Sequence, residues 1–155
     1  MRNARSSPPP ESPCNATAMR KASRRVTQLY DDALAPCGLR STQHAILAEL
    51  DRRSDEPPTM RELAQALVMD RSALGHTLRP LEREGLIALQ ESADDRRRRL
   101  VVMTPAGMAK LRVAKQLWQT AQDRFEHVVG APEAADLRAA LLGIARAERL
   151  SRLHD

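Results

Sequence analysis

Aromatic residues are almost missing from this sequence of 155 residues, which has only Tyr30, Trp118 and Phe125. Proteins that hold single-stranded nucleic acid stack its bases on aromatic side chains, so the composition argues against that class. Long apolar runs are missing as well. No segment approaches the length of a membrane-spanning helix, and the N-terminus lacks the apolar core of a signal peptide. We therefore expect a cytoplasmic protein that is not associated with a membrane.

The residue patterns of catalytic and metal sites are also missing. Cys14 and Cys37 are the only cysteines, and in the cytoplasm both are expected to be reduced thiols. Metal-ligand spacing is found neither with these cysteines nor among the four histidines, His44, His76, His127 and His154. No nucleophile has an evident base partner, and no glycine-rich phosphate loop is present. We expect neither an enzyme nor a requirement for a metal or a cofactor.

Positive charge, in contrast, is in excess. The chain has 25 Lys and Arg residues against 20 Asp and Glu residues, a net charge of +5, and a pI of about 10.0. This balance favours an acidic partner, nucleic acid before an anionic membrane. Only three of the cations are lysines. Arginine suits bidentate contacts to phosphate and guanine, although a GC-rich genome produces the same bias.

The organisation of the chain follows from its apolar periodicity. Residues 1–13 are polar, proline-rich and aperiodic, which predicts a disordered tail, and residues 14–155 have the length of a single domain. Helical spacing predicts one helix up to Leu34 and another that Ser41 caps. The pair Thr104–Pro105 opens a long helix, and a last helix begins at about Pro132.

Two shorter helices are predicted in the middle of the chain. Thr59 and Glu62 match a capping box, and Asp70 can cap a helix that runs toward Gly85. Pro80 should kink or end that second helix near Arg79, because proline removes a helical hydrogen bond.

Two short apolar segments, 86–90 and 99–103, read as strands of a hairpin. A helix-turn-helix followed by a hairpin is a winged-helix layout. We therefore predict a mainly α fold with a small β-hairpin wing (α+β), with the winged helix-turn-helix over about 40–104.

The helix after Asp70 has a polar face that can enter a major groove. Its residues are Arg71, Ser72, Gly75, His76 and Arg79. Gly75 costs about 1 kcal/mol relative to alanine in a helix, and a close approach of the helix backbone to DNA would explain that cost. The alternative is the solvated face of an ordinary amphipathic helix.

Four adjacent arginines occupy the tip of the predicted hairpin. An arginine on a wing fits the narrow minor groove, where the negative potential is focused. Asp95 can pair with Arg97 and fix its direction, while Arg96, Arg98 and Arg99 contact phosphates or brace the turn. A charge run is usually a solvated turn, but basicity, helix-turn-helix and wing together indicate a protein that binds double-stranded DNA.

Three segments resemble the MarR family of transcriptional regulators, over about residues 15–150. They are GLRSTQHAIL from Gly38, TMRELAQALVMDRSALGHTLRPLEREGLI from Thr59 and DDRRRRLVVMTPAG from Asp94. In the last segment the family's wing signature is filled by Asp95, Arg97, Thr104 and Gly107, and Met103 stands where leucine is usual.

The resemblance implies a homodimer joined by helices over about 14–36 and 105–150. It also implies binding to a palindromic operator, most simply as a repressor that a small aromatic or phenolic acid-like ligand releases. The ligand would lie between the dimer helices and the winged helix, where we consider Ser23, Arg24, His44 and Trp118. An arginine and a histidine can hold a carboxylate there, although each residue also has an ordinary role in a helix or a core.

Two other functions remain open. In the hydroperoxide-sensing branch of the family a reactive cysteine lies near the start of the first helix, where a helix N-terminus lowers the thiol pKa. Cys14 is about two residues early and the chain has one tyrosine, so we favour an inert thiol. The other alternative is a winged-helix module that coats DNA with little sequence preference or binds a protein.

Overall fold

The computed structural model describes residues 13–93, 95, 98–147 and 150. Its elements are α1 (Asn15–Leu34), a short 3-10 helix η1 (Ala35–Cys37), α2 (Ser41–Arg52), α3 (Met60–Ala66), α4 (Arg71–Arg83), β1 (Ile87–Glu91), β2 (Arg99–Met103), α5 (Pro105–Val129) and α6 (Ala131–Arg146). The predicted fold class, mainly helical with a hairpin wing, is confirmed. The predicted disordered tail lies outside the described residues except for Pro13.

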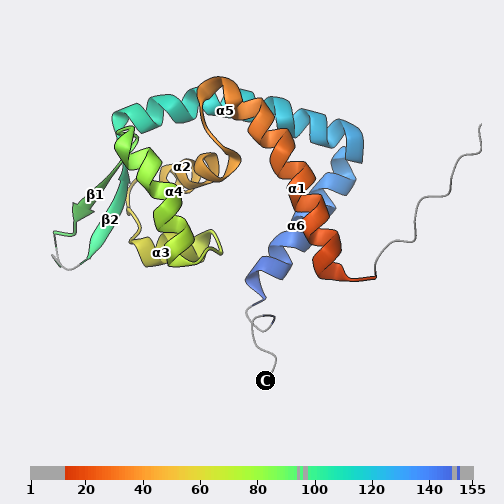
Figure 1. The fold of residues 1–155 in the computed structure, drawn as a ribbon, viewed down its shortest axis with the longest axis horizontal. Coiled ribbons are helices and arrows are strands. Elements are labelled where there is room, and N and C mark those ends of the chain that lie inside the picture. The colour runs from red at the N-terminus through yellow and green to blue at the C-terminus, as the bar shows by residue number, and fades with distance from the viewer. Residues whose placement is uncertain (1–12, 94, 96–97, 148–149, 151–155) are drawn as a thin grey trace, which may run out of the picture.

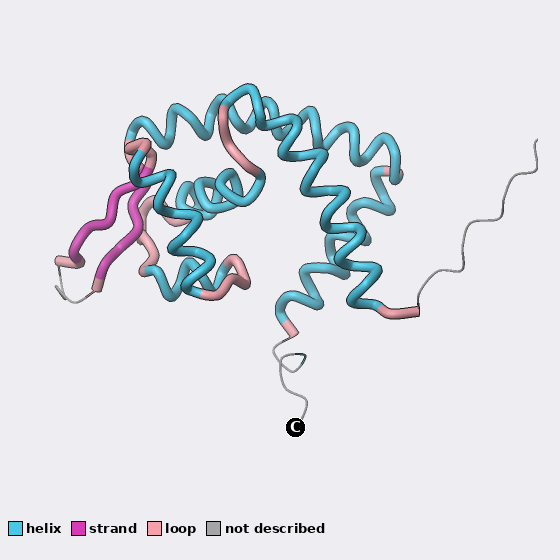
Figure 2. Tube along the Cα trace, viewed as in Figure 1, coloured by secondary structure: helices cyan, strands magenta, loops and turns pink. Residues whose placement is uncertain are grey.

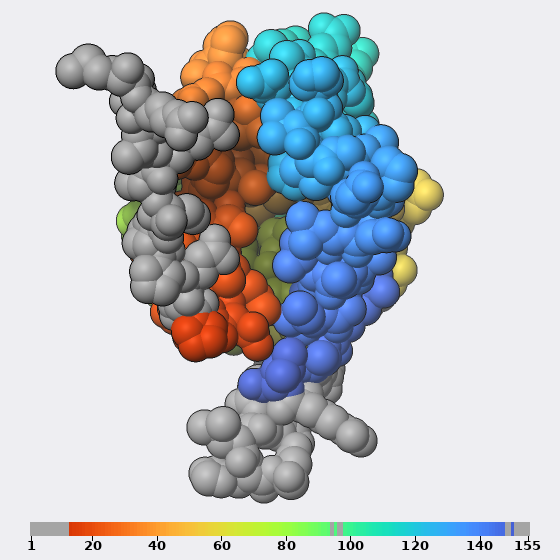
Figure 3. Space-filling model, turned by 90° about the vertical axis from the view of Figure 1, so that its right-hand side faces the viewer, coloured from red at the N-terminus to blue at the C-terminus, as the bar shows by residue number. Residues whose placement is uncertain are grey.

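Helix α5 spans the molecule and joins two lobes (Figure 1). One lobe holds α2, α3, α4 and the hairpin, and the two strands lie at the end of the molecule opposite α1 and α6 (Figure 2). In the other lobe α1 and α6 both pack against α5. A side view shows α1 and α6 both extending below α5 (Figure 3).

The hydrophobic core belongs almost entirely to the winged lobe. It is formed by leucines and other apolar residues of α2, α3, α4, the strands and the first half of α5. In the other lobe, the 20-residue helix α1 buries only Leu34 and the 16-residue helix α6 buries only Ala134. The winged lobe is therefore self-sufficient in burial, whereas α1 and α6 leave most of their apolar surface exposed.

The start of α2 differs from the prediction by one residue. Ser41 is the first helical residue and not the N-cap, a position that Arg40 occupies. The Asp31 carboxylate, from α1, accepts the Ser41 N–H at 2.7 Å, and the Gln43 side chain accepts the Arg40 N–H at 2.9 Å. A side chain from the preceding helix thus takes the role predicted for the serine hydroxyl.

The caps of the helix-turn-helix are confirmed. Thr59 donates its N–H to the Glu62 carboxylate at 2.7 Å and accepts the Glu62 N–H at 3.3 Å, and the Asp70 carboxylate accepts the Ala73 N–H at 2.8 Å. In the turn between the two helices Val68 has a left-handed backbone (φ 51°). That conformation costs an L-residue about 1–2 kcal/mol, so the packed helices on either side must hold the turn.

Helix α4 runs toward Gly85 as predicted, and of the two effects considered for Pro80 an end of the helix near Arg79 does not occur. The helix continues through Pro80 to Arg83, and Gly85 follows it with φ 69°. Proline removes only its own N–H from the helical ladder. Downstream, the Pro80 carbonyl still accepts the Glu84 N–H at 2.9 Å, and Leu81 is fully buried in the core. Burial of Leu81 therefore outweighs one lost hydrogen bond.

The hairpin is antiparallel with the pairs Ile87–Met103 to Glu91–Arg99 in register. A third segment joins it from the loop before α3. The Pro58 carbonyl accepts the Val101 N–H at 2.8 Å, and Thr59 forms a bridge with Leu100. The base of the wing is therefore bonded directly to the start of α3.

A compact junction links α4, the wing and α5. The Thr104 hydroxyl donates to the Gly85 carbonyl at 2.6 Å and accepts the Gly107 N–H at 3.1 Å, while the Thr104 N–H reaches the Leu86 carbonyl at 3.0 Å. A Cβ on Gly107 would overlap that Leu86 carbonyl oxygen. Glycine is needed here because α5 approaches the chain at the start of β1 so closely.

Replacing Gly107 by alanine is expected to destabilise the protein by about 1–3 kcal/mol, the usual cost of overpacking. Gly75→Ala is the matched control, since it is the same change within a helix and nothing lies within 4 Å of the new Cβ. It should stabilise the protein by about 1 kcal/mol through helix propensity. Urea denaturation followed by circular dichroism measures both changes, and shifts of the same sign would contradict the close packing of Gly107.

Candidate nucleic-acid interface

The polar face of α4 is exposed as predicted. Arg71, Ser72, His76 and Arg79 are exposed and Gly75 is partly exposed. The opposite face buries Leu74, Leu78 and Leu81 in the core. The helix therefore presents two cations and two further polar side chains to solvent on a rigid support.

Gly75 has no neighbour that requires a glycine. Apart from the backbone of α4 itself, no atom of the described residues lies within 4 Å of a Cβ built there, and its φ angle is not positive. Neither packing nor backbone conformation inside the protein accounts for the helix propensity that this residue loses.

A cleft of about 690 Å³ lies between α3, the start of α4 and the wing. Its lining residues are Thr59, Met60, Arg61, Glu62, Gln65, Arg71, Arg98 and Arg99. Four guanidinium groups from three elements thus face one space, which suits a polyanion. The sequence analysis missed Arg61 and Gln65, although their i, i+4 spacing on α3 puts them on one helix face.

The wing tip is described only in part. The Asp95 carbonyl accepts the Arg98 N–H and the Arg98 carbonyl accepts the Ser92 N–H, both at 2.9 Å. Arg98 pairs with the Glu62 carboxylate of α3 at 3.3 Å, and Arg99 lies opposite Glu91 in the ladder. Arg96 and Arg97 lie outside the described residues, so the orientation of Arg97 by Asp95 stays a prediction.

The four candidate effector residues occupy two separate places. His44 and Trp118 stack, with ring centroids 6.1 Å apart and ring planes inclined by 12°, and Tyr30 lies 6.5 Å from Trp118. Ser23 and Arg24 are exposed and line an open groove of about 370 Å³ along α1, together with Asp31, Arg40 and neighbouring residues. No described pocket has lining residues from both places.

His44 is buried with an unsatisfied nitrogen. Its side chain lies between α2 and Trp118 of α5, and its Nε2 atom has no hydrogen-bond partner among the described residues. Burial lowers the His44 pKa, and the positive charge of Lys115 lowers it further. The imidazole is therefore held in its neutral form at the junction between the lobes.

The two cysteines differ in environment. Cys14 is exposed just before α1, and hydrogen bonds from the Thr17 side chain and then from the backbone of Thr17 and Ala16 lower its pKa. Cys37 is buried, and its thiol donates to the Leu34 carbonyl at 3.1 Å. Thiolate character is thus favoured at Cys14, as a helix N-terminus predicts.

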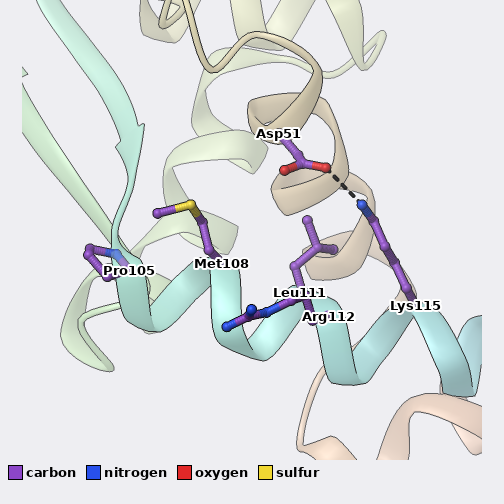
Figure 4. Close-up of a pocket in the computed structure, with 6 residues that line it drawn as sticks. All are labelled: Asp51, Pro105, Met108, Leu111, Arg112 and Lys115. Atoms are coloured by element: carbon purple, nitrogen blue, oxygen red, sulfur yellow. Dashed lines mark hydrogen bonds and ion pairs between the residues drawn. The ribbon is translucent and has the colours of Figure 1, made fainter.

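A further groove of about 390 Å³ runs between α2 and the first half of α5 (Figure 4). Lys115 crosses it to pair with Asp51 at 2.8 Å, and Met108 and Leu111 give it an apolar floor. None of the predicted site residues lines this groove.

No group of three or more His, Cys, Asp or Glu side chains in the described part of the chain is arranged to hold a metal ion. No helix in that part is long and apolar enough to cross a membrane.

The stability of the protein should fall as the pH drops below about 6.5, the ordinary histidine pKa. Below that pH the His44 side chain binds a proton in the unfolded chain but stays neutral in the folded protein. The folded state therefore loses stability until the pH reaches the lowered pKa of His44. His44→Gln should flatten this slope, whereas His127→Gln, at an exposed position of α5, should keep it. Thermal melts between pH 7.5 and 5.5 measure the slopes, and an unchanged slope in His44→Gln would refute the assignment.

Comparison with known proteins gives a consistent set of similarities. A family model described as MarR family matches residues 38–98. The transcriptional regulator MosR of M. tuberculosis, solved in complex with DNA, is 31% identical with a TM-score of 0.79, over 90% of this chain and 99% of that one. A transcriptional repressor, CouR, bound to a 23-mer DNA duplex, is 30% identical with a TM-score of 0.78, over 86% of this chain and 93% of that one.

CouR from Rhodococcus jostii RHA1, bound to p-coumaroyl-CoA, is similar in fold. It is 23% identical with a TM-score of 0.74, over 85% of this chain and 92% of that one. No curated protein matches the sequence. The similarity to solved structures covers both lobes, whereas the family model covers most of the winged lobe.

Proposed function

Because this chain belongs to the MarR family of winged helix-turn-helix transcriptional regulators, we propose that it is a homodimeric repressor of a palindromic operator that a small acidic ligand releases. Regulators of this family bind DNA and are not enzymes. Three points go beyond family membership: the residues that contact DNA, the assembly of the protomers, and the signal that releases the DNA.

The arginine-lined cleft between α3, α4 and the wing carries the proposal for DNA. Arg71 at the start of α4 shares this cleft with Arg98 and Arg99 of the wing. We assign base contacts to the α4 face of Arg71, Ser72, Gly75, His76 and Arg79, and backbone contacts to the cleft. Asp95, Arg96 and Arg97 complete the interface in the adjacent minor groove.

The proposed dimer rests on the exposed apolar surface of α6. Leu137, Leu141 and Ile144 lie on one face of that helix, each more than 40% exposed. An apolar stripe on a helix is normally buried, and α6 buries only Ala134 within the protomer. A second copy that packs against α1, α5 and α6 would cover this surface. Two α4 helices would then enter successive major grooves of a palindrome.

The proposed effector is an aromatic or phenolic acid. CouR, a protein of the same fold, binds p-coumaroyl-CoA, whose acyl group is the thioester-linked form of a phenolic acid. In this chain the stacked pair His44 and Trp118 offers an aromatic wall and an unpartnered Nε2 atom that can bond a carboxyl or phenol group. Ser23 and Arg24 line the separate α1 groove. They would contact a different part of the ligand, or a ligand bound to the partner protomer.

A redox signal at Cys14 is the second candidate. Its exposure and its lowered pKa are properties that sensor thiols share. Oxidation at the start of α1 would act on the proposed dimer helices. A solvent-exposed N-terminal thiol has the same two properties without any role, so the ligand remains the first proposal.

Arg71→Ala and Arg79→Ala should each weaken DNA binding by about 1–3 kcal/mol, the cost of losing a bidentate base contact. The probe is a duplex that the parent protein enriches from a random library, measured by fluorescence anisotropy. Arg20→Ala, at an exposed position of α1, removes the same charge from the other lobe and should leave the affinity unchanged.

Retained affinity in both α4 variants would remove the recognition role from that helix. A library that yields no enriched sequence, despite tight binding to random duplex, would indicate a DNA-coating module instead.

Cys14→Ser should respond to ligand as the parent does. We expect p-coumarate or a related aromatic acid to raise the melting temperature and to release the enriched duplex from both proteins, and peroxide to release it from neither. If peroxide releases the duplex from the parent and not from Cys14→Ser, the redox function replaces the ligand-responsive one.

A further inference from the structure

The cleft at the proposed DNA interface contains one carboxylate that its function does not explain. Glu62 is the only acidic residue among the eight that line it, beside Arg61, Arg71, Arg98 and Arg99. A negative charge on a surface that meets phosphates repels them and lowers affinity. Glutamine can also fill the third position of a capping box, so beyond its favourable interaction with the N-terminus of α3 the charge of Glu62 has no role in the cap.

The two oxygens of Glu62 have different partners. Oε2 accepts the Thr59 N–H at 2.7 Å and the Thr59 hydroxyl at 2.8 Å, whereas Oε1 accepts from the Arg98 guanidinium at 3.3 Å. The hydrogen bonds from Thr59 lower the Glu62 pKa, and the charge of Arg98 adds to this effect. One oxygen is thus fixed by the start of α3, and the other is directed at the wing.

The Glu62–Arg98 pair lies beyond the backbone contacts that join the wing to the chain before α3, and the backbone of Arg98 itself is bonded within the hairpin, to Ser92 and Asp95. The base of the hairpin is held to the chain before α3 through Pro58–Val101 and Thr59–Leu100, and its ladder ends at Glu91–Arg99. Arg98 is the residue next toward the tip. No other ion pair between α3 and the wing is found among the described residues.

We propose that Glu62 is a positioning residue that holds Arg98 and thereby fixes the wing tip relative to α3 and α4. Arg98 then acts as a brace and not as a phosphate ligand, and Arg99 beside it meets the DNA from a fixed direction. This inference rests on the proposed DNA-binding role of the cleft. Its energetic basis is preorganisation, since a wing held in its bound position loses less freedom on binding.

The pair is suited to positioning more than to stability. The side chains of Arg98 and Glu62 are 54% and 44% exposed, and exposed ion pairs add little to folding stability because water screens them. Loss of the pair should therefore change DNA binding with almost no change in the melting temperature.

The test compares Glu62→Gln with Glu56→Gln, using the enriched duplex. Glutamine retains one acceptor oxygen for the Thr59 cap, and it removes the charge and the second oxygen that faces Arg98. Glu56 is an exposed carboxylate in the loop before α3 without an ion pair in the described part of the chain, so its variant makes the same change of net charge. We expect Glu62→Gln to weaken binding about two- to fivefold, the factor that the coupling of an exposed ion pair supplies, and Glu56→Gln not to weaken it.

Two further readouts separate positioning from lost contacts. The slope of log affinity against log salt should stay unchanged in Glu62→Gln, whereas loss of one phosphate contact would reduce it by about 0.9. Arg98→Ala should weaken binding by a similar factor, and the double variant should be no weaker than Arg98→Ala alone.

Three outcomes would overturn the inference: tighter binding of Glu62→Gln at every salt concentration, additive effects in the double variant, or a reduced salt slope for Arg98→Ala. Arg71→Ala separates this failure from that of the proposed function. If Arg71→Ala weakens binding and Glu62→Gln does not, only the positioning role is lost. If neither variant changes the affinity, the cleft is not the DNA interface.

Discussion

The structure depends on a short contact at the start of α5. There Thr104 and Gly107 lie directly against the chain at Gly85 and Leu86. The Thr104 hydroxyl bonds the end of α4 and the start of α5 at once, and Gly107 lets α5 lie directly on the Leu86 carbonyl. Four elements meet there, namely α4, β1, β2 and α5. The orientation of α4 relative to the wing and to α5 is therefore set by the Thr104 hydroxyl and by close backbone packing at Gly107.

Burial is divided unequally on the two sides of that contact. The winged lobe surrounds a continuous core and includes the residues assigned to DNA, whereas α1 and α6 expose leucines, a methionine and an isoleucine. A winged lobe with a complete core and a helical lobe with exposed apolar surface are what a DNA-binding protomer needs if a partner is to complete its fold. The stacked rings of His44 and Trp118 lie between the two lobes. This position is why we consider them the candidate effector site.

Local signals predicted most of the fold. Thr59, Asp70 and Thr104 all cap helices as expected, because capping depends on residues within one turn. The start of α2 was misplaced because Asp31 caps it from another helix, and Pro80 was misjudged because burial of Leu81 is a tertiary effect. In the candidate site the exposed α4 face was predictable from periodicity. The Glu62–Arg98 pair was not, since 36 residues separate its members and Glu62 already had a complete role in its cap.

Helix α5 is long and uninterrupted, so a small tilt at one end produces a larger displacement at the other end. The helix has 25 residues, and from Met108 to Val129 it contains neither glycine nor proline. At 1.5 Å per residue it is about 37 Å long, so a tilt of about 5° at one end moves the other end by about 3 Å, roughly the rise of one base pair. A small tilt of α5 where α1 and α6 pack against it would therefore move the winged lobe at its other end by a comparable distance.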